Sequence, residues 1–281
     1  MNIYKFHTRK VIGLLALYLT IAMTLIVLLL PVYWMVVTSL RPEEDIYTGV
    51  KLIPNPISFY NFIDLFREIN FQVYVVNSLM VASSATSLSL IISIFAAYSL
   101  ARLEYRGKEY VSRILLFAYL FPSMALVIPL YMILHSLGLI DNLLGLILVY
   151  LTFTTPFSTW ILRGYFRSIP PDLEEAAMVD GCSRIGAIFK VLLPVAAPGI
   201  VATTVFSFTL SWNEFLYALV IINSDRFRTV PIGILGLTFA DVYPWGRLMA
   251  AGVLASIPAL IIYLVMQRYV VQGLAAGAVK G

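Results

Sequence analysis

The chain has 281 residues, of which 60% are hydrophobic and 12% are charged, and its formal net charge is +4. Soluble domains carry about 25% charged residues, so this composition argues against a cytosolic enzyme, a secreted domain and a nucleic-acid-binding protein. One cysteine excludes an internal disulfide, and two histidines argue against a histidine-based metal centre. The composition is instead typical of a chain that crosses a lipid bilayer several times.

Six apolar runs are long enough to cross a bilayer as helices, each about 20 residues or more. They lie at residues 11–37, 73–101, 112–134, 143–162, 199–222 and 248–267. The first run is too long for the apolar core of a signal peptide and is followed by no small-residue cleavage site, so we expect an uncleaved first helix. Prolines inside the later runs are expected to kink or unwind their helices, namely Pro122, Pro129, Pro156 and Pro258.

The distribution of basic residues predicts how the chain is oriented. Six spans leave both termini on one side of the membrane. Most of the 19 lysines and arginines lie on that side, in the two tails and in the connections around 102–113 and 163–190. The positive-inside rule therefore predicts that both termini are cytoplasmic. The long connections 38–72 and 223–247 are then predicted to lie outside.

The cytoplasmic connection at 168–194 carries the most specific pattern in the chain. Pro171 suits the first turn of a helix, where a missing N–H costs nothing. The acidic residues that follow favour the positive end of the helix dipole, and Gly181 suits a left-handed turn after it. A second helix is expected from about Ser183, ended by Pro194. Its apolar face is expected to comprise Ile185, Ile188, Phe189 and Leu192.

This hairpin resembles a known motif. Glu175-Ala176-Ala177, three residues, Gly181, nine residues and Val191-x-Leu193-Pro194 are similar to the EAA loop of ABC importer permeases, with Val191 in place of the usual isoleucine. The resemblance implies that the hairpin is the coupling element that docks into a cytoplasmic ATPase. The residues implied in this docking are Glu174, Glu175, Ala176, Ala177, Asp180, Gly181, Leu193 and Pro194.

Nearly the whole chain resembles the maltose-type sugar branch of that family. The motifs that carry the likeness are Asn77-Ser78, Ala96-Ala97-Tyr98 with Arg102, Pro129-Leu130-Tyr131, Leu137-Gly138-Leu139 and Trp212-Asn213-Glu214-Phe215. The resemblance implies an all-α integral membrane protein with the type I ABC importer permease fold. It also implies a single permease domain over 1–281, with a first helix at 11–37, core spans over 73–267, the hairpin and a tail at 269–281.

The resemblance further implies partners. They are a second, different permease subunit, two ATP-binding cassette ATPase subunits and an extracytoplasmic sugar-binding protein. A similar tail in the maltose branch inserts between the ATPase subunits, which implicates Gly277, Ala278, Val279, Lys280 and Gly281. The loop at 223–247 corresponds loosely to one that reaches the binding protein, which implicates Gly233, Gly236 and Asp241. No G-x4-G-K-[ST] sequence occurs, so ATP and Mg²⁺ are expected on the partner ATPase and no cofactor on this chain.

Candidates for the translocation pathway come from polar residues inside spans. Glu214 is a carboxylate deep in the fifth apolar run, where an ionised group is costly and therefore functional by default. The alternative is a structural hydrogen bond to another helix or to a partner subunit. Trp212 could stack on a sugar ring or pack against neighbouring helices. Asn213 could share a hydrogen-bond network with Glu214, and Asn77 and Ser78 open the second span.

The predicted function is that of a non-enzymatic permease subunit of an ATP-driven sugar importer in the cytoplasmic membrane of a prokaryote. An ABC permease for another solute is the first alternative, because the hairpin alone does not specify a sugar. A proton-coupled carrier or an intramembrane hydrolase is the second. A carrier would need an inverted repeat and further membrane acids, and a serine hydrolase would need a histidine at the depth of its serine, whereas His135 lies at the outer edge.

Overall fold

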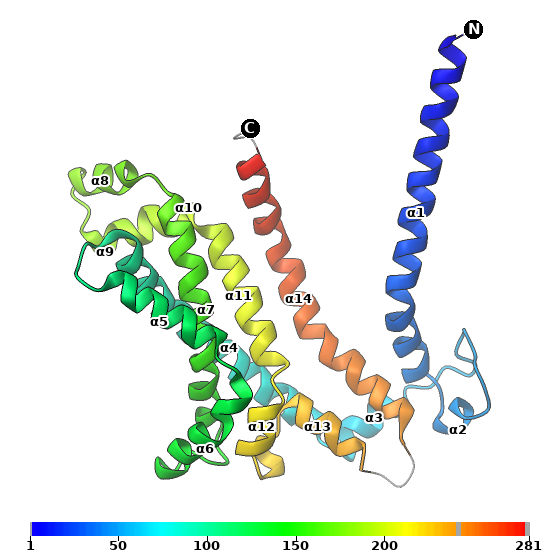
Figure 1. Cartoon of the computed structure of the whole chain (residues 1–281). Coiled ribbons are helices and arrows are strands. Elements are labelled where there is room, and N and C mark those ends of the chain that lie inside the picture. Colours follow the sequence, from blue (N-terminus) through cyan, green and yellow to red (C-terminus); the bar gives the residue numbers. More distant parts are fainter. Residues whose placement is uncertain (1, 240–242, 279–281) are drawn as a thin grey trace. The chain divides into compact units, whose positions relative to one another are not determined.

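The computed structural model describes residues 2–239 and 243–278, and side chains over 13–239 and 243–267. Throughout these described residues the chain is helical or irregular, with no strand. It divides into two compact units (Figure 1). Unit 1 comprises Met1–Asn70 and Leu237–Leu254, and unit 2 comprises Phe71–Gly236 and Ala255–Gly281.

Four described helices contain a segment long and apolar enough to cross a bilayer alone. They are α1 (Asn2–Ser39), α4 (Phe71–Arg102), α7 (Leu143–Ser168) and α14 (Trp245–Ala278). Two more spans pass only as bent pairs. The first joins α5 (Lys108–Leu120) to η1 (Ser123–Leu126) and α6 (Val127–Ser136) through a 94° bend, and the second joins Arg184–Val195 to α11 (Ala197–Trp212) through an 81° bend. The expected all-α, multi-span class is therefore confirmed.

Prolines act differently at different positions. Pro122 lies between α5 and η1, where the missing N–H helps to end one helix and to begin another. Pro156 and Pro258 lie inside α7 and α14, and both helices continue through them. Membrane helices tolerate such prolines because neighbouring groups satisfy the freed carbonyls.

The fifth apolar run is not the single helix expected over 199–222. The helix α11 ends at Trp212, residues 213–215 leave the helical conformation, and α12 (Leu216–Ile221) follows. The carboxylate of Glu214 accepts hydrogen bonds from the backbone N–H groups of Tyr217 and Ala218, at 3.0 and 3.1 Å. These bonds satisfy two free donors at the start of α12, and so support the break.

In unit 2, α4, α7 and α11 pack against one another (Figure 1). Small hydroxyl side chains line their contacts. Ser158 on α7 lies 3.0 Å from Ser207 on α11, and Thr159 donates to Ser93 on α4 at 3.1 Å. Small polar residues let membrane helices approach closely. Ser89 and Ser93 of α4 thus serve helix packing, whereas Ser83 and Ser87 are exposed.

One end of unit 2 carries the hairpin of α8 (Pro171–Val179) and α9 (Arg184–Ala187), and the opposite end carries α6 and α12 (Figure 1). We call these the hairpin end and the loop end. At the loop end, the side chain of Asn77 donates to the carbonyl oxygens of Arg226 and Arg228, both at 2.9 Å. The hydroxyl of Ser78 accepts the N–H of Val230 at 2.8 Å. These bonds fix η3 (Asp225–Phe227) and the start of α13 (Val230–Leu237) on α4.

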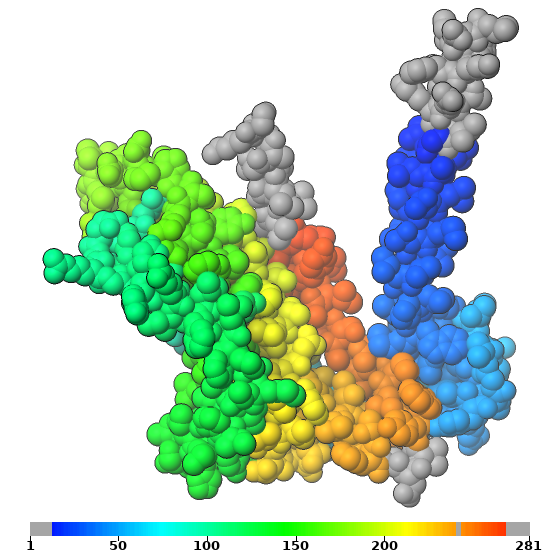
Figure 2. All heavy atoms as spheres, viewed as in Figure 1, coloured from blue at the N-terminus to red at the C-terminus, as the bar shows by residue number. Residues whose placement is uncertain are grey.

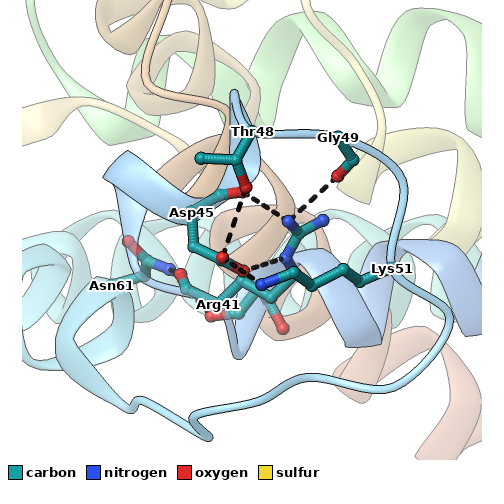
Figure 3. Close-up of polar contacts among 7 residues, drawn as sticks. Arg41, Asp45, Thr48, Gly49, Lys51 and Asn61 are labelled. Atoms are coloured by element: carbon teal, nitrogen blue, oxygen red, sulfur yellow. Dashed lines mark hydrogen bonds and ion pairs between the residues drawn. The ribbon is translucent and has the colours of Figure 1, made fainter.

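Unit 1 contains α1, α2 (Glu43–Ile46), α3 (Tyr60–Arg67) and the beginning of α14. A polar cluster closes the loop after α1 (Figure 3). The buried Arg41 pairs with Asp45 at 2.8 Å and donates to the carbonyl oxygen of Gly49 at 3.1 Å, while Lys51 contacts the same carboxylate. The Lys51 ammonium and the Arg41 guanidinium hold the pKa of Asp45 below its usual range.

The helix α3 buries polar as well as apolar side chains. Asn61 and Asp64 are buried together with Leu65, which is 0% exposed, whereas Tyr60 and Ile63 are exposed. Asn61 donates to the carbonyl oxygens of Ser39 and Arg41, at 2.9 and 2.8 Å. Asn61 thus satisfies carbonyl groups at the open end of α1. The exposed Tyr60 and Ile63 suit a helix at a membrane boundary.

Candidate functional site

The turn of the hairpin depends on one glycine. At the end of α8, the N–H of Asp180 bonds to the carbonyl of Ala176 at 2.9 Å, and the N–H of Cys182 bonds to that of Ala177 at 3.0 Å. Gly181 lies between them with φ +88°, a left-handed conformation that other residues adopt only at a cost. The side chain of Ser183 then caps α9 by accepting the N–H of Gly186 at 3.1 Å. The turn and the start of the second helix lie where the sequence predicts them, and the cap is an addition from the structure.

Two adjacent carboxylates of α8 point in different directions. Glu174 is buried and accepts a hydrogen bond from the hydroxyl of Tyr98. Its other oxygen lies 3.4 Å from the guanidinium of Arg102, which also donates to the carbonyl of Ile169 at 2.7 Å. Glu175 is exposed. The hairpin is therefore fixed to the end of α4 through Glu174, and its opposite face is free.

That free face is short and contains small and apolar side chains. Ala176 is exposed beside Glu175, Val179 is 87% exposed, and Leu173 is 45% exposed. Figure 2 shows the spheres of α8 and α9 at the surface of the hairpin end of unit 2. These side chains are therefore not covered by any other part of the described chain.

The second helix of the hairpin departs from the expectation in two ways. It does not stop at Pro194, because α9 continues through a π-helical turn, η2 (Ile188–Leu192), into α10 (Leu193–Val195), and the 81° bend follows. The π-turn also changes the apolar face. Ile188 and Leu192 are buried, whereas Ile185 and Phe189 are 61% and 54% exposed. The two buried side chains belong to a core with Tyr98 and Phe166 that fixes the hairpin to the helix bundle.

A cavity of about 470 Å³ lies where two broken spans face each other in unit 2. Phe121 and Ser123, at the bend after α5, form one wall, and Asn213, Glu214 and Phe215 form the opposite wall. Helix breaks expose backbone groups and polar side chains at membrane depth, and such positions line substrate sites in other transporters. Two of the predicted pathway residues, Asn213 and Glu214, therefore line a common cavity.

Glu214 is held in place rather than loose. Besides the two N–H groups of α12, its carboxylate accepts the hydroxyl of Tyr150 at 3.0 Å. Tyr217 closes the same region by donating its hydroxyl to the carbonyl of Ser123 at 2.7 Å, across the two breaks. Glu214 is partly exposed at a break between two helices, whereas the sequence suggests a position deep inside a continuous helix. Tyr150 and Tyr217 carry no sequence signal of this role beyond being tyrosines in apolar runs.

The other pathway candidates lie away from this cavity. Trp212 is 3% exposed, stacks on Phe208 and donates its indole N–H to the carbonyl of Ala255 at 3.0 Å. It thus packs α11 against α14. Asn77 and Ser78 hold the backbone of the loop end, as described above.

The residues expected to contact a binding protein also lie in different surroundings. Gly233 is buried, and a Cβ on it would lie 2.3 Å from the ring of Tyr74, whereas Gly236 is exposed. Asp241 lies outside the described residues. At the carboxyl end, Gly277 and Ala278 belong to α14, while Val279, Lys280 and Gly281 lie outside the described residues.

Comparison with known proteins identifies the family. The model of the family described as "Binding-protein-dependent transport system inner membrane component" matches residues 65–276. The trehalose/maltose transport system permease protein MalG of Thermococcus litoralis is 37% identical over 261 residues, which cover 91% of this chain and 93% of that protein. The trehalose transport system permease protein SugB of Mycobacterium tuberculosis is 38% identical over 255 residues, covering 90% and 92% of the two chains.

The fold has a solved counterpart. A chain of a bacterial ABC transporter involved in import of the acidic polysaccharide alginate superposes with a TM-score of 0.79, covering 92% of this chain and 96% of that one at 23% identity. The fold is therefore that of an ABC importer permease. By the family match over residues 65–276 and by the two relatives, the chain belongs to the family of binding-protein-dependent transport system inner membrane components, and it is a multi-pass transport subunit rather than an enzyme.

Proposed function

We propose that this chain is the permease subunit of an ATP-driven importer of a sugar or oligosaccharide. It would lie in the cytoplasmic membrane of a prokaryote with both termini inside. The observation that carries the proposal is the hairpin: Glu174 joins it to α4, while Glu175 and Ala176 face outward beside it. A rigid element with one face bonded to a span and one face free is what transmission of motion from a motor subunit requires.

In this proposal the free face of the hairpin docks on a cytoplasmic ATPase. ATP and Mg²⁺ bind there, because this chain has no phosphate-binding loop. Closure of two ATPase subunits would move the hairpin, and the bonds of Glu174 would pass that movement to α4. Gly181 sets the turn, and Leu193 and Pro194 lie in the helix that joins the hairpin to α11.

The apolar surface of the chain supports a second permease subunit as partner. None of the most apolar window of α1, in Gly13–Ser39, is buried within the chain. A chain of this family provides half of a pathway, so we propose a heterodimer whose second half comes from a different permease. Lipid covers the remainder of the apolar surface.

At the loop end we propose contact with an extracytoplasmic sugar-binding protein. Gly236 is exposed there, and Asp241 lies in the same connection along the sequence, while Gly233 packs closely on Tyr74 of α4. At the other terminus, residues 277–281 are proposed to insert between the ATPase subunits. Deleting them should change ATP hydrolysis without changing membrane topology, and unchanged hydrolysis would contradict this insertion.

A sugar is proposed as the substrate because the two relatives described above transport trehalose, or trehalose and maltose, by name. The test is uptake of labelled trehalose and maltose by proteoliposomes that contain the complete transporter. Saturable uptake that needs the binding protein supports the proposal. Uptake of amino acids or phosphate in place of sugars would favour a permease for another solute.

A further inference from the structure

A cavity of about 400 Å³ lies in unit 1, where α1 ends and α14 begins. Three aromatic side chains line it, namely those of Trp34 on α1, Tyr47 directly after α2 and Trp245 at the start of α14. The aliphatic part of the lining consists of Ile46, Val50 and Met249. The volume falls within the range of small-molecule sites, and a lining of this kind suits a largely apolar ligand.

The cavity lies at a boundary of the bilayer, because one span ends and another begins there. The two candidate spans are Gly13–Ser39 of α1 and Trp245–Gln267 of α14. Trp34 lies about 8 Å before the end of the first span, at a rise of 1.5 Å per residue. Tryptophan and tyrosine gather at this depth in membrane proteins, between the headgroups and the hydrocarbon. The cavity is therefore at the level where a lipid has its glycerol backbone.

One polar group in the cavity wall has no partner in the chain. Thr38 is 4% exposed, and within the described residues its hydroxyl oxygen makes no hydrogen bond. Arg41 also lines the cavity, but its guanidinium is paired with Asp45 and bonded to the carbonyl of Gly49 (Figure 3). A buried hydroxyl that lacks a partner is unfavourable. The hydroxyl of Thr38 therefore points to a ligand oxygen, while the paired Arg41 does not demand an anionic ligand.

The surface beside the cavity is apolar. Val50, on the cavity lining, is exposed, and so are Leu52 and Ile53 after it. The carbonyl of Leu52 accepts a hydrogen bond from the hydroxyl of Tyr33 on α1, which holds this stretch of chain beside the span at the depth of Trp34. Exposed apolar patches mark surfaces that contact a membrane or a partner. A water-soluble ligand in the cavity would leave this patch open to water, whereas a lipid covers both.

We propose that this cavity binds one membrane glycerophospholipid of the adjacent leaflet. The glycerol backbone would lie between the rings of Trp34 and Trp245, and one of its linkage oxygens would accept the hydroxyl hydrogen of Thr38. The first methylene groups of one chain would lie on Met249. With both termini in the cytoplasm, as proposed above, this is the outer leaflet. Such a lipid would join the end of α1 to the start of α14, whatever solute is transported.

The first test measures lipid binding by the purified full chain in detergent. Trp245→Leu removes one ring from the cavity. Trp160→Leu is the matched control, because Trp160 has a similar exposure, 39% against 42%, and lines a different cavity on α7. Native mass spectrometry counts the phosphatidylglycerol molecules bound per chain as this lipid is titrated.

We expect one molecule to bind saturably to the unchanged chain and to Trp160→Leu. The Kd should rise roughly tenfold in Trp245→Leu, the effect of losing one large aromatic contact. Phosphatidylcholine should bind with a Kd within about threefold of that of phosphatidylglycerol, because recognition is through the glycerol region. Equal Kd values for the two tryptophan variants, binding without saturation, or a requirement for an anionic headgroup would each overturn the site.

Thr38→Val separates lipid binding from a purely structural role. Valine keeps the shape of threonine but removes the unpaired hydroxyl, so in lipid-free detergent the variant should be at least as stable as the unchanged chain. Saturating phosphatidylglycerol should then raise the Tm of the unchanged chain more than that of Thr38→Val, because a ligand stabilises in proportion to its affinity. Equal increases in Tm would contradict the contact between Thr38 and the lipid.

A thiol on the cavity lining locates the lipid. Cys182 is the only cysteine in the sequence, so Cys182→Ser gives a background in which Val50→Cys presents a single thiol at the cavity. Phosphatidylglycerol at about four times its Kd should slow modification of this thiol by a water-soluble maleimide roughly fivefold. Ile57→Cys is the control, because Ile57 is also exposed but does not line the cavity. Equal protection of both thiols would contradict a localised site.

Discussion

Tyr98 donates its hydroxyl hydrogen to the carboxylate of Glu174, and this buried bond joins the hairpin of α8 and α9 to the end of α4. Arg102, one turn further along α4, pairs with the same carboxylate at 3.4 Å. The neighbouring Glu175 is exposed and takes no part in this contact. Adjacent residues therefore have different surroundings: Glu174 is bonded within the chain, and Glu175 is left exposed.

We expect Glu174→Ala and Glu175→Ala to behave differently. Losing Glu174 leaves Arg102 and the Tyr98 hydroxyl without their acceptor, and should destabilise the hairpin by about 1–3 kcal/mol. Losing the exposed Glu175 should change stability by less than about 0.5 kcal/mol and weaken ATPase association instead. Thermal unfolding of the purified chain and co-purification with the ATPase measure the two effects. Equal destabilisation by both variants would contradict this division.

The turn at Gly181 gives a second prediction. A Cβ there would meet no atom within 4 Å, so the cost of Gly181→Asp lies in the backbone, which has φ +88°. A left-handed conformation costs an L-residue about 1–2 kcal/mol, and we expect insertion to persist while ATP hydrolysis becomes uncoupled from uptake. Gly164→Ala on α7 is the matched control, because its Cβ also meets open space but its backbone is that of a right-handed helix. Normal stimulation of hydrolysis by the binding protein in the Gly181 variant would contradict the coupling role.

Two glycines of α13 should differ in tolerance. A Cβ at Gly233 would lie 2.3 Å from the Tyr74 ring, which itself packs edge-on against the buried Phe71. Overpacking of this kind costs about 1–3 kcal/mol. At Gly236 the nearest atom is the Arg228 guanidinium at 3.6 Å, so Gly236→Ala should leave the melting temperature unchanged. Similar melting temperatures for both variants would show that Gly233 is not a packing position.

Asp141 should make the stability of the loop end depend on pH. Its carboxylate accepts hydrogen bonds from the N–H groups of Ser224 and Asn223, at 2.9 and 3.0 Å. These bonds lower the pKa of Asp141 below its usual value, and the bond from Ser224 has the larger effect. A lowered folded-state pKa means that the stabilisation is present above the unfolded pKa of about 3.9 and is lost as pH falls through the folded value.

The matched variants for this prediction are Asp141→Asn and Asp141→Ala. Asparagine keeps an acceptor and tolerates the φ of +55° at this position, but it cannot titrate. The stability advantage of the unchanged chain over Asp141→Asn should therefore shrink between pH 6 and pH 3, as measured by thermal unfolding. Asp141→Ala should be the least stable at every pH, and a constant gap between Asp and Asn would contradict the titration.

Hydropathy predicted where the chain crosses the membrane because each span needs its own apolar length. Pro122 indicated the break between α5 and η1, because proline lacks the N–H group that the interior of a helix needs. The break at 213–215 had no such signal, because it depends on Glu214 reaching the N–H groups of α12 and on Tyr150 from another helix. The burial of Asn61 on α3 was equally hidden, since it depends on hydrogen bonds to the distant carbonyls of Ser39 and Arg41.

The hairpin was predictable in its turn but not in its faces. Gly181 and Ser183 have fixed local roles that sequence spacing reveals. The π-turn at Ile188–Leu192 and the inward direction of Glu174 arise from packing on α4 and α7, which no local pattern encodes. Tyr98 and Arg102 lie four residues apart, one helical turn, and this spacing is the one signal that could have indicated a shared partner.

The central claim is that this chain couples ATP hydrolysis to sugar entry. The most direct test is trehalose and maltose uptake by proteoliposomes that hold this chain, its partner permease and the ATPase, with the binding protein outside and ATP inside. We expect accumulation that requires internal ATP and persists when ionophores collapse the proton gradient. Accumulation that persists without the ATPase and stops when the proton gradient collapses would contradict the claim.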